Sequence, residues 1–125
     1  MADLFHFELV SPERRLESGT AAMVVVPGSE GDFGVLPGHA PLMSTIRPGA
    51  IAIYEADSNT LTRRIFVDGG FAEVNDKGLT ILAESAMPVG DIDPAQVATQ
   101  LAAARAANDE KAVERLEAMQ AAVVN

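Results

Sequence analysis

The residues whose types could support chemistry gather in one short segment of this chain, residues 30–42 (EGDFGVLPGHAPL). The segment holds two carboxylates, Glu30 and Asp32, and the histidine His39, but no lysine, arginine, serine or cysteine. A phosphate-binding loop would need a cation and a nucleophile site would need a hydroxyl or thiol, so both are disfavoured. Glycines and prolines punctuate the segment while its hydrophobic residues keep strand-like spacing. We therefore predict a shaped loop that is held ready for another protein.

Each of these side chains also has a plainer interpretation. Glu30 and Asp32 would project to one side of an extended segment, where they could form an acid–base pair or simply be solvated. His39 titrates near neutrality, but no catalytic or metal-ligand pattern surrounds it, so a turn histidine bonded to backbone or to a partner is favoured. His6, on the polar face of a predicted strand, receives the same interpretation. The sequence thus predicts no catalytic residue, no metal site and no cofactor.

Short strands separated by turn residues occupy most of the chain up to residue 86. Over residues 4–10 the residues alternate, which places Phe5, Phe7 and Leu9 on one face of a half-buried strand. Many short strands at close intervals indicate an antiparallel sandwich, so the predicted fold is mainly β, a two-sheet antiparallel β-sandwich over residues 1–86. Further strands are predicted at residues 21–26, 50–54, 61–67, 71–74 and 79–83, with a turn at 11–13 and a bend at 18–19.

Helical signals replace the strand pattern after residue 86. Asp93 followed by Pro94 is typical of a helix start, because the carboxylate accepts from free backbone N–H groups and proline fits the first helical position. Asn108 and Asp109 can end this helix and cap a second one. We therefore predict a C-terminal helical hairpin over residues 87–125 that packs on itself or on the sandwich. The apolar stripes at helical spacing are Val97 and Leu101, then Val113, Leu116, Met119 and Val123.

Composition narrows the classes of partner. The chain of 125 residues is one domain, or one domain with an appendage, and its net charge of −9 disfavours nucleic acid and anionic membrane surfaces. No apolar segment approaches the roughly 20 residues of a membrane span, and the N-terminus lacks the features of a signal peptide. The sequence contains no cysteine, which excludes disulfides and suits a reducing compartment. If this protein acts at a membrane, we expect another subunit to hold it there.

Four sequence blocks in fixed order resemble the epsilon subunit of the bacterial rotary ATP synthase. They are residues 34–42 (GVLPGHAPL), 47–49 (RPG), 67–74 (VDGGFAEV) and 79–84 (LTILAE). The resemblance weakens after residue 87. Without these blocks the composition would equally fit a free-standing β-sandwich adaptor unrelated to rotary motors, and an enzyme would need a polar pocket around His39.

The resemblance implies a non-catalytic subunit of the central stalk that links the gamma subunit to the ring of c subunits. It implies a peripheral position at the cytoplasmic face of the inner membrane, with the alpha and beta subunits as further partners of the C-terminal helices. The loop that carries Glu30, Asp32, Gly38 and His39 matches the family's ring-facing loop, where acidic side chains would meet basic ones. The C-terminal region from Asp91 onward holds six acidic and three basic residues. We therefore expect weak inhibition of ATP hydrolysis, or none.

A nucleotide-binding motif of the same family is only partly present. The family pattern is Ile-Asp-x-x-Arg-Ala, and the chain has Ile92 and Asp93 but Gln96 in place of the arginine. Loss of that guanidinium removes a bidentate phosphate contact, for which Arg105 is one possible substitute. Ile92, Asp93 and Arg105 are thus weak candidates for nucleotide binding, and a simple helix cap is the favoured role of Asp93.

Overall fold

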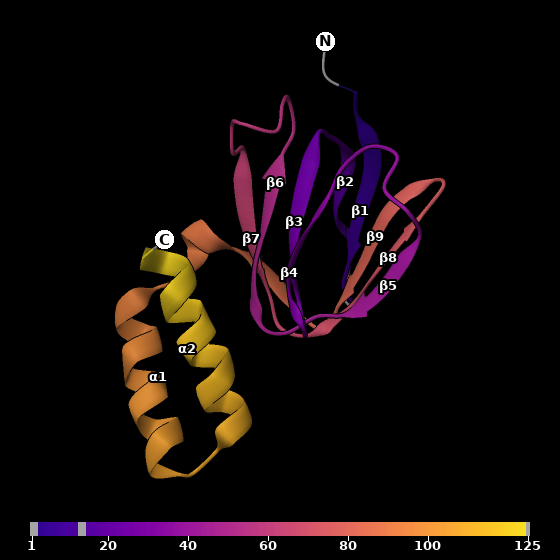
Figure 1. Ribbon diagram of the computed structural model, residues 1–125. Helices are drawn as coiled ribbons and strands as arrows, with labels where there is room; N and C mark the ends of the chain where they lie inside the picture. The colour runs from indigo at the N-terminus through magenta and orange to yellow at the C-terminus, as the bar shows by residue number, and fades with distance from the viewer. Residues whose placement is uncertain (1–2, 13–14, 125) are drawn as a thin grey trace.

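The computed structural model describes residues 3–12 and 15–124, with the backbone alone for residues 15–17. Strands fill the first two thirds of the chain and a pair of helices the last third (Figure 1). Among these residues no helix is long and apolar enough to cross a bilayer. The strands are β1 (Phe5–Val10), β2 (Arg15–Ala21), β3 (Met23–Gly28), β4 (Gly31–Val35), β5 (Leu42–Thr45), β6 (Gly49–Tyr54), β7 (Arg63–Val67), β8 (Gly70–Asn75), β9 (Gly78–Ala83) and β10 (Ala86–Pro88). A 3-10 turn (Val89–Asp91) leads to α1 (Pro94–Ala106) and α2 (Glu110–Val124).

The strands form two five-stranded sheets that face each other. Sheet 1 has the order β2-β1-β9-β8-β5, and sheet 2 has the order β10-β7-β6-β3-β4. The paired strands are antiparallel except for β1 and β9, which run parallel. The prediction of a two-sheet, mainly antiparallel β-sandwich followed by a helical hairpin is confirmed.

Side chains of alternate residues fill the space between the two sheets. Phe7 and Leu9 of β1, each 1% exposed, lie on the face that the period-two pattern predicts. Val24 and Val26 meet them from sheet 2. Within the described residues this core contains no buried polar or charged side chain, so packing of branched aliphatic groups holds the sheets together.

The helical hairpin packs against the outer face of sheet 2, beside β6 and β7 (Figure 1). Phe66 of β7 points away from the core between the sheets and joins a second apolar cluster with the helices. That cluster includes Val97 and Leu101 of α1 and Leu116 of α2, three members of the predicted stripes. The hairpin therefore rests on the sandwich as well as on itself.

The helix boundaries follow from capping. The Asp93 carboxylate accepts from the backbone N–H groups of Ala95 at 3.0 Å and Gln96 at 3.4 Å, and Pro94 is the first residue of α1. Asn108 has a φ of 56° between the helices, and the Asp109 carboxylate accepts from Ala112 N at 3.2 Å. Both predicted caps are confirmed.

Several strands differ from the predicted pattern. The bend expected at residues 18–19 is wrong, because both lie inside β2, where Gly19 pairs with Phe7. The apolar run 21–26 is divided at Ala22, whose N–H donates to Tyr54 O at 2.7 Å as the chain crosses from sheet 1 to sheet 2. Within the segment 30–42, residues 31–35 form the strand β4, and residues 36–41 connect it to β5, which begins at Leu42. Strand β10 was not predicted, and the turn expected at residues 11–13 extends outside the described residues.

Candidate functional site

The β3–β4 hairpin forms a fixed tip at one end of the sandwich. Ser29 and Glu30 make the turn, and both are exposed. The segment before β6 is hydrogen-bonded to this tip: Ser29 N–H donates to Thr45 O at 3.0 Å, and Arg47 N–H donates to Pro27 O at 3.0 Å. The hydroxyl groups of Ser29 and Thr45 lie 2.7 Å apart. These bonds join segments that are 16 or more residues apart, so the tip is part of the sandwich rather than a free loop.

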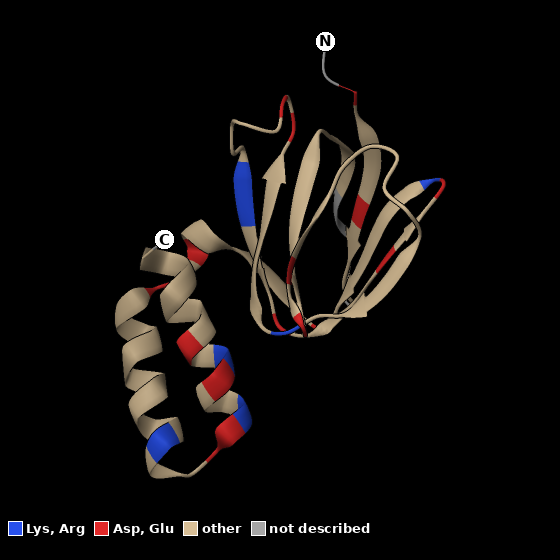
Figure 2. Cartoon of the chain, in the orientation of Figure 1, with Lys and Arg blue, Asp and Glu red and all other residues tan. Residues whose placement is uncertain are grey.

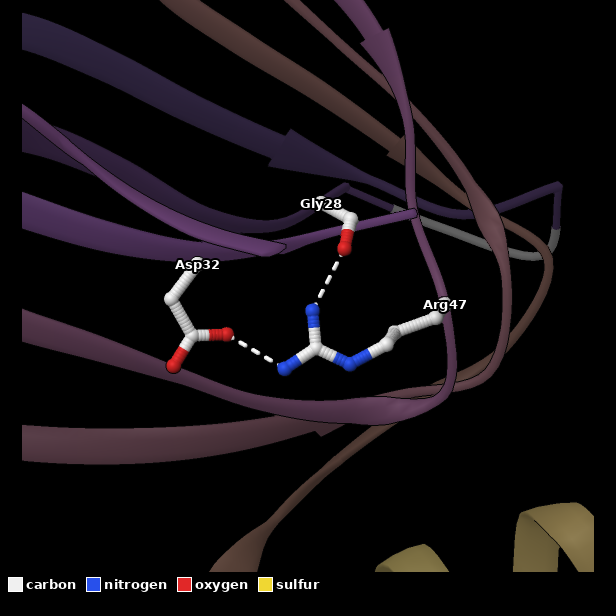
Figure 3. Close-up of polar contacts among 3 residues, drawn as sticks. All are labelled: Gly28, Asp32 and Arg47. Carbon is white, nitrogen blue, oxygen red and sulfur yellow. Dashed lines mark hydrogen bonds and ion pairs between the residues drawn. The ribbon is translucent and has the colours of Figure 1, made fainter. Parts of the chain in front are cut away.

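Arg47 pairs with the carboxylate that was predicted to be a free acidic contact. Its guanidinium donates to the Asp32 carboxylate, with Nη2 to Oδ1 at 2.5 Å, and to the carbonyl oxygen of Gly28 (Figure 3). The charge of Asp32 is thereby largely balanced inside the chain. Glu30 has no ion pair among the described residues. Of the two predicted acidic residues, Glu30 is the one that presents unbalanced charge at this end.

Gly38 and His39 lie in the connection between β4 and β5. The His39 N–H donates to Leu36 O at 3.1 Å, and its ring Nδ1 lies 2.6 Å from the Ala40 carbonyl oxygen. His39 is therefore a turn histidine bonded to backbone. It lines a surface hollow of about 630 Å³ together with His6, Lys77 and neighbouring apolar residues.

The structure separates the four predicted partner-binding residues into two pairs. Glu30 and Asp32 lie where β4 begins, whereas Gly38 and His39 follow its other end at Val35. Five residues of strand extend about 16 Å, so the two pairs occupy opposite ends of the sandwich. The grouping of all four on one surface was an error of the sequence argument, which treated the segment as one loop.

A row of exposed apolar side chains crosses the outer face of sheet 1, and sequence reasoning did not assign it to the site. Phe71 is paired with Leu82, and Leu82 with Val10, so the three lie side by side on that face. Phe71 and Leu82 are 37% and 38% exposed, and Met43 on β5 is 66% exposed. A shallow hollow of about 390 Å³ lies along the row. Figure 1 shows the hairpin on the opposite side of the sandwich, away from β8 and β9.

The three weak nucleotide-binding candidates are not assembled into one pocket. Ile92 is buried in the cluster under the hairpin, and Asp93 caps α1. Arg105 lies near the other end of α1, about 18 Å along the helix, where its guanidinium pairs with Glu117 at 3.1 Å. Within the part of the chain that the structure describes, no group of three His, Asp or Glu side chains is placed to hold a metal ion.

Three comparisons with known proteins agree with this geometry. The family described as "ATP synthase, Delta/Epsilon chain, beta-sandwich domain" matches residues 4–89. A Maricaulis maris protein named ATP synthase epsilon chain is 55% identical over 132 residues, covering 97% of each chain. A Rhodospirillum rubrum protein of the same name is 47% identical over 126 residues, covering 99% of this chain and 92% of that one.

Solved structures with the same arrangement come from ATP synthases. A chain in the cryo-EM structure of the Euglena gracilis mitochondrial ATP synthase (OSCP/F1/c-ring) superposes with a TM-score of 0.84 at 27% identity, covering 95% of this chain and 81% of that one. A chain of the Tetrahymena thermophila central stalk/c-ring structure superposes with a TM-score of 0.65 at 14% identity, covering 98% of each, and supports the fold alone. The sandwich, the hairpin and the relatives of nearly equal length together show that this chain belongs to the ATP synthase delta/epsilon chain family.

Proposed function

We propose that this chain is the epsilon subunit of an ATP synthase central stalk, where it joins the gamma subunit to the c ring and transmits rotation between them. The observation that carries the proposal is the asymmetry of the sandwich. The chain's own helices cover the outer face of sheet 2, while the outer face of sheet 1 presents Phe71, Leu82 and Met43 to solvent. An exposed apolar row of this kind on a small protein is typical of an interface with another protein. The subunit supplies contacts and no catalytic group.

We assign the apolar row of sheet 1 to the gamma subunit. The Phe71 side chain exposes roughly 70 Å² of apolar surface to solvent. Covering that surface with a partner would contribute about 2 kcal/mol to the free energy of binding, at 25 cal/mol per Å². Leu82 is exposed to a similar fraction, and both are held rigidly by cross-strand pairing. A rigid apolar surface loses little conformational entropy when a partner covers it, which favours a lasting contact.

We assign the tip that carries Glu30 to the c ring. The tip projects from one end of the sandwich, and the bonds of Arg47 fix its shape (Figure 3). An exposed carboxylate on a rigid turn can pair with a basic side chain of a polar loop in the c ring. Such an ion pair fixes the orientation of the two subunits more than it increases their binding affinity. The subunit would then lie at the cytoplasmic face of the inner membrane, held there by the ring.

We further propose that the hairpin, residues 87–125, inhibits ATP hydrolysis weakly or not at all. Most of its charged residues lie in the half of the hairpin near the turn that connects the helices (Figure 2), while Asp91 and Asp93 lie at the other end, and acidic residues outnumber basic ones. Acidic helices would be repelled by acidic loops of catalytic subunits. The sandwich, residues 1–86, would carry the stalk function, and the alpha and beta subunits would be at most secondary partners.

The gamma assignment is tested by titrating the full-length chain with purified gamma subunit and comparing two serine variants. Phe71→Ser removes an apolar side chain from the row and is expected to weaken binding about tenfold or more. Val124→Ser is the matched control, because Val124 is 82% exposed but lies at the end of α2. Equal affinity of the Phe71→Ser variant and the native chain would refute the assignment, and absence of binding by the native chain would refute the proposed function itself.

A further inference from the structure

One carboxylate lies within the apolar row of sheet 1. Glu73 belongs to β8, where its chain neighbours Ala72 and Val74 are 1% and 4% exposed and point into the core between the sheets. Because successive side chains of a strand point to opposite faces, Glu73 points outward, toward the face that the hairpin leaves open. Its side chain is half-buried by its neighbours on that face.

Strand pairing surrounds Glu73 with exposed apolar side chains. Met43 of β5 is paired with it on one side, and Thr80 of β9 on the other. Phe71 precedes it by two residues on the same face, at a Cα separation of about 7 Å, and Leu82 is its diagonal neighbour. Met43, Phe71 and Leu82 are 66%, 37% and 38% exposed. A partner that covers these three side chains must therefore cover Glu73 as well.

The chain itself offers no cation to this carboxylate. Among the described residues, Glu73 has no ion pair and no side-chain hydrogen bond. The strands β5, β8 and β9 contain no lysine or arginine. Water solvates the charge of Glu73 while the face is open, but a covering partner would remove that water. Burial of an unpaired carboxylate is strongly unfavourable, so the partner has to bring a cation to this position.

We propose that the gamma surface covering sheet 1 carries an arginine whose guanidinium pairs with Glu73 and stacks on Phe71. This pairing rests on the proposed function, since it takes gamma as the partner, and it adds the chemistry that gamma must supply. A guanidinium can donate two parallel hydrogen bonds to a carboxylate while its planar face lies on an aromatic ring. It is also more weakly hydrated than the ammonium of lysine, which suits a position that the complex closes off from water.

Glu73 then decides which surfaces the apolar row accepts. The apolar side chains would contact any apolar surface, but a surface without a cation opposite Glu73 would leave the carboxylate buried and unpaired. Two copies of this chain stacked through the same face would bring their Glu73 carboxylates together without a cation from the surrounding strands. The same residue thus favours gamma and opposes self-association.

Titration of the full-length chain with purified gamma subunit tests the pairing. Glu73→Gln keeps the size of the side chain and removes its charge, and it should weaken binding about thirtyfold or more, mainly through faster dissociation. Glu114→Gln is the matched control, because Glu114 is exposed on α2, on the other side of the sandwich, and its loss should leave affinity unchanged. An unchanged urea midpoint shows that each variant is folded.

The opposite result is equally well defined. If gamma covered Glu73 without a cation, Glu73→Gln would bind as tightly as the native chain or more tightly, and the pairing would be refuted. Loss of affinity in Phe71→Ser together with native affinity in Glu73→Gln would refute the pairing and leave the proposed function standing. Absence of binding by the native chain would instead refute the proposed function.

Two reagents distinguish arginine from lysine as the cation. Phenylglyoxal modifies arginine side chains, and mass spectrometry should show one gamma arginine that reacts in free gamma and is protected in the complex. A water-soluble carbodiimide joins carboxylates to amines, so it should form no amide bond between Glu73 and gamma. An amide bond between Glu73 and a gamma lysine, or a complex in which no gamma arginine is protected, would overturn the assignment of arginine.

Discussion

Two glycines with nearly the same positive φ should respond very differently to substitution by alanine. Gly78 begins β9 with a φ of 132°, and Gly31 begins β4 with a φ of 134°. A Cβ atom at residue 78 would lie 2.0 Å from the carbonyl oxygen of His6, whereas at residue 31 it would meet no atom within 4 Å. The pair therefore separates the cost of the backbone conformation from the cost of the steric clash.

The expected magnitudes follow from these geometries. A side chain at such a φ costs about 1–3 kcal/mol, so Gly31→Ala should lower the free energy of unfolding by about 2 kcal/mol. Gly78→Ala adds a backbone clash that forces β1 away from β9, and overpacking of this kind costs about 1–3 kcal/mol more. The loss at residue 78 should therefore reach about 4 kcal/mol, a large part of the 5–15 kcal/mol that holds a typical domain together.

Urea unfolding followed by circular dichroism measures both variants. With a slope of about 1.5 kcal/mol per molar urea, the midpoint of Gly78→Ala should fall about 1.3 M below that of Gly31→Ala. Equal midpoints would contradict the reasoning, because the clash with His6 O would then have no energetic consequence and the β1–β9 pairing could not be as close as the structure places it.

Three other changes have defined outcomes. The Asp57 carboxylate accepts backbone hydrogen bonds from Asn59 and Thr60 that lower its pKa below 3.8. The stability that these bonds contribute is therefore present above that pH and is lost as the pH falls through the folded-state pKa. Asp57→Ala should lower the urea midpoint at pH 7 and have a smaller effect at pH 3. Arg47→Gln should destabilise the tip and raise proteolytic cleavage after Glu30, while the double variant with Asp32→Asn should be less affected than the sum of the single changes. Calorimetry with Mg-ATP should show weak or absent binding by the native chain, and Gln96→Arg should bind more tightly if the remaining contacts of a nucleotide site are present.

Period-two alternation and capping were sufficient to predict much of the fold. The strand at residues 4–10 and the start of α1 at Pro94 were predicted because each has a local signal, an alternating face in one case and an Asp-Pro cap in the other. The bend predicted at residue 19 is wrong, because strand pairing with Phe7 outweighs the weak preference of Ser-Gly for a bend.

The candidate site was less accessible from sequence, because its contacts are long-range. Arg47 and Asp32 are 15 residues apart in the sequence, and they meet where residues 45–47 pair with residues 27–29. Glu30 and His39 lie far apart because β4 is an extended strand between them. Two of the five residues of β4 are glycine, so the alternation typical of a strand is hard to recognise in its sequence. The apolar row of Phe71 and Leu82 carried a usable signal: both are outward-facing residues of predicted strands, and a large apolar residue at such a position indicates a partner.

Cysteine crosslinking in the assembled ATP synthase is the most direct test of the claim that this subunit joins gamma to the c ring. The chain has no cysteine of its own, so a single one can be placed at Glu30 on the tip or at Leu82 on sheet 1. The account predicts that the cysteine at residue 30 crosslinks to the polar loop of the c subunit and the one at residue 82 crosslinks to gamma. Crosslinks from both positions to the same subunit, or from either only to alpha or beta, would contradict it.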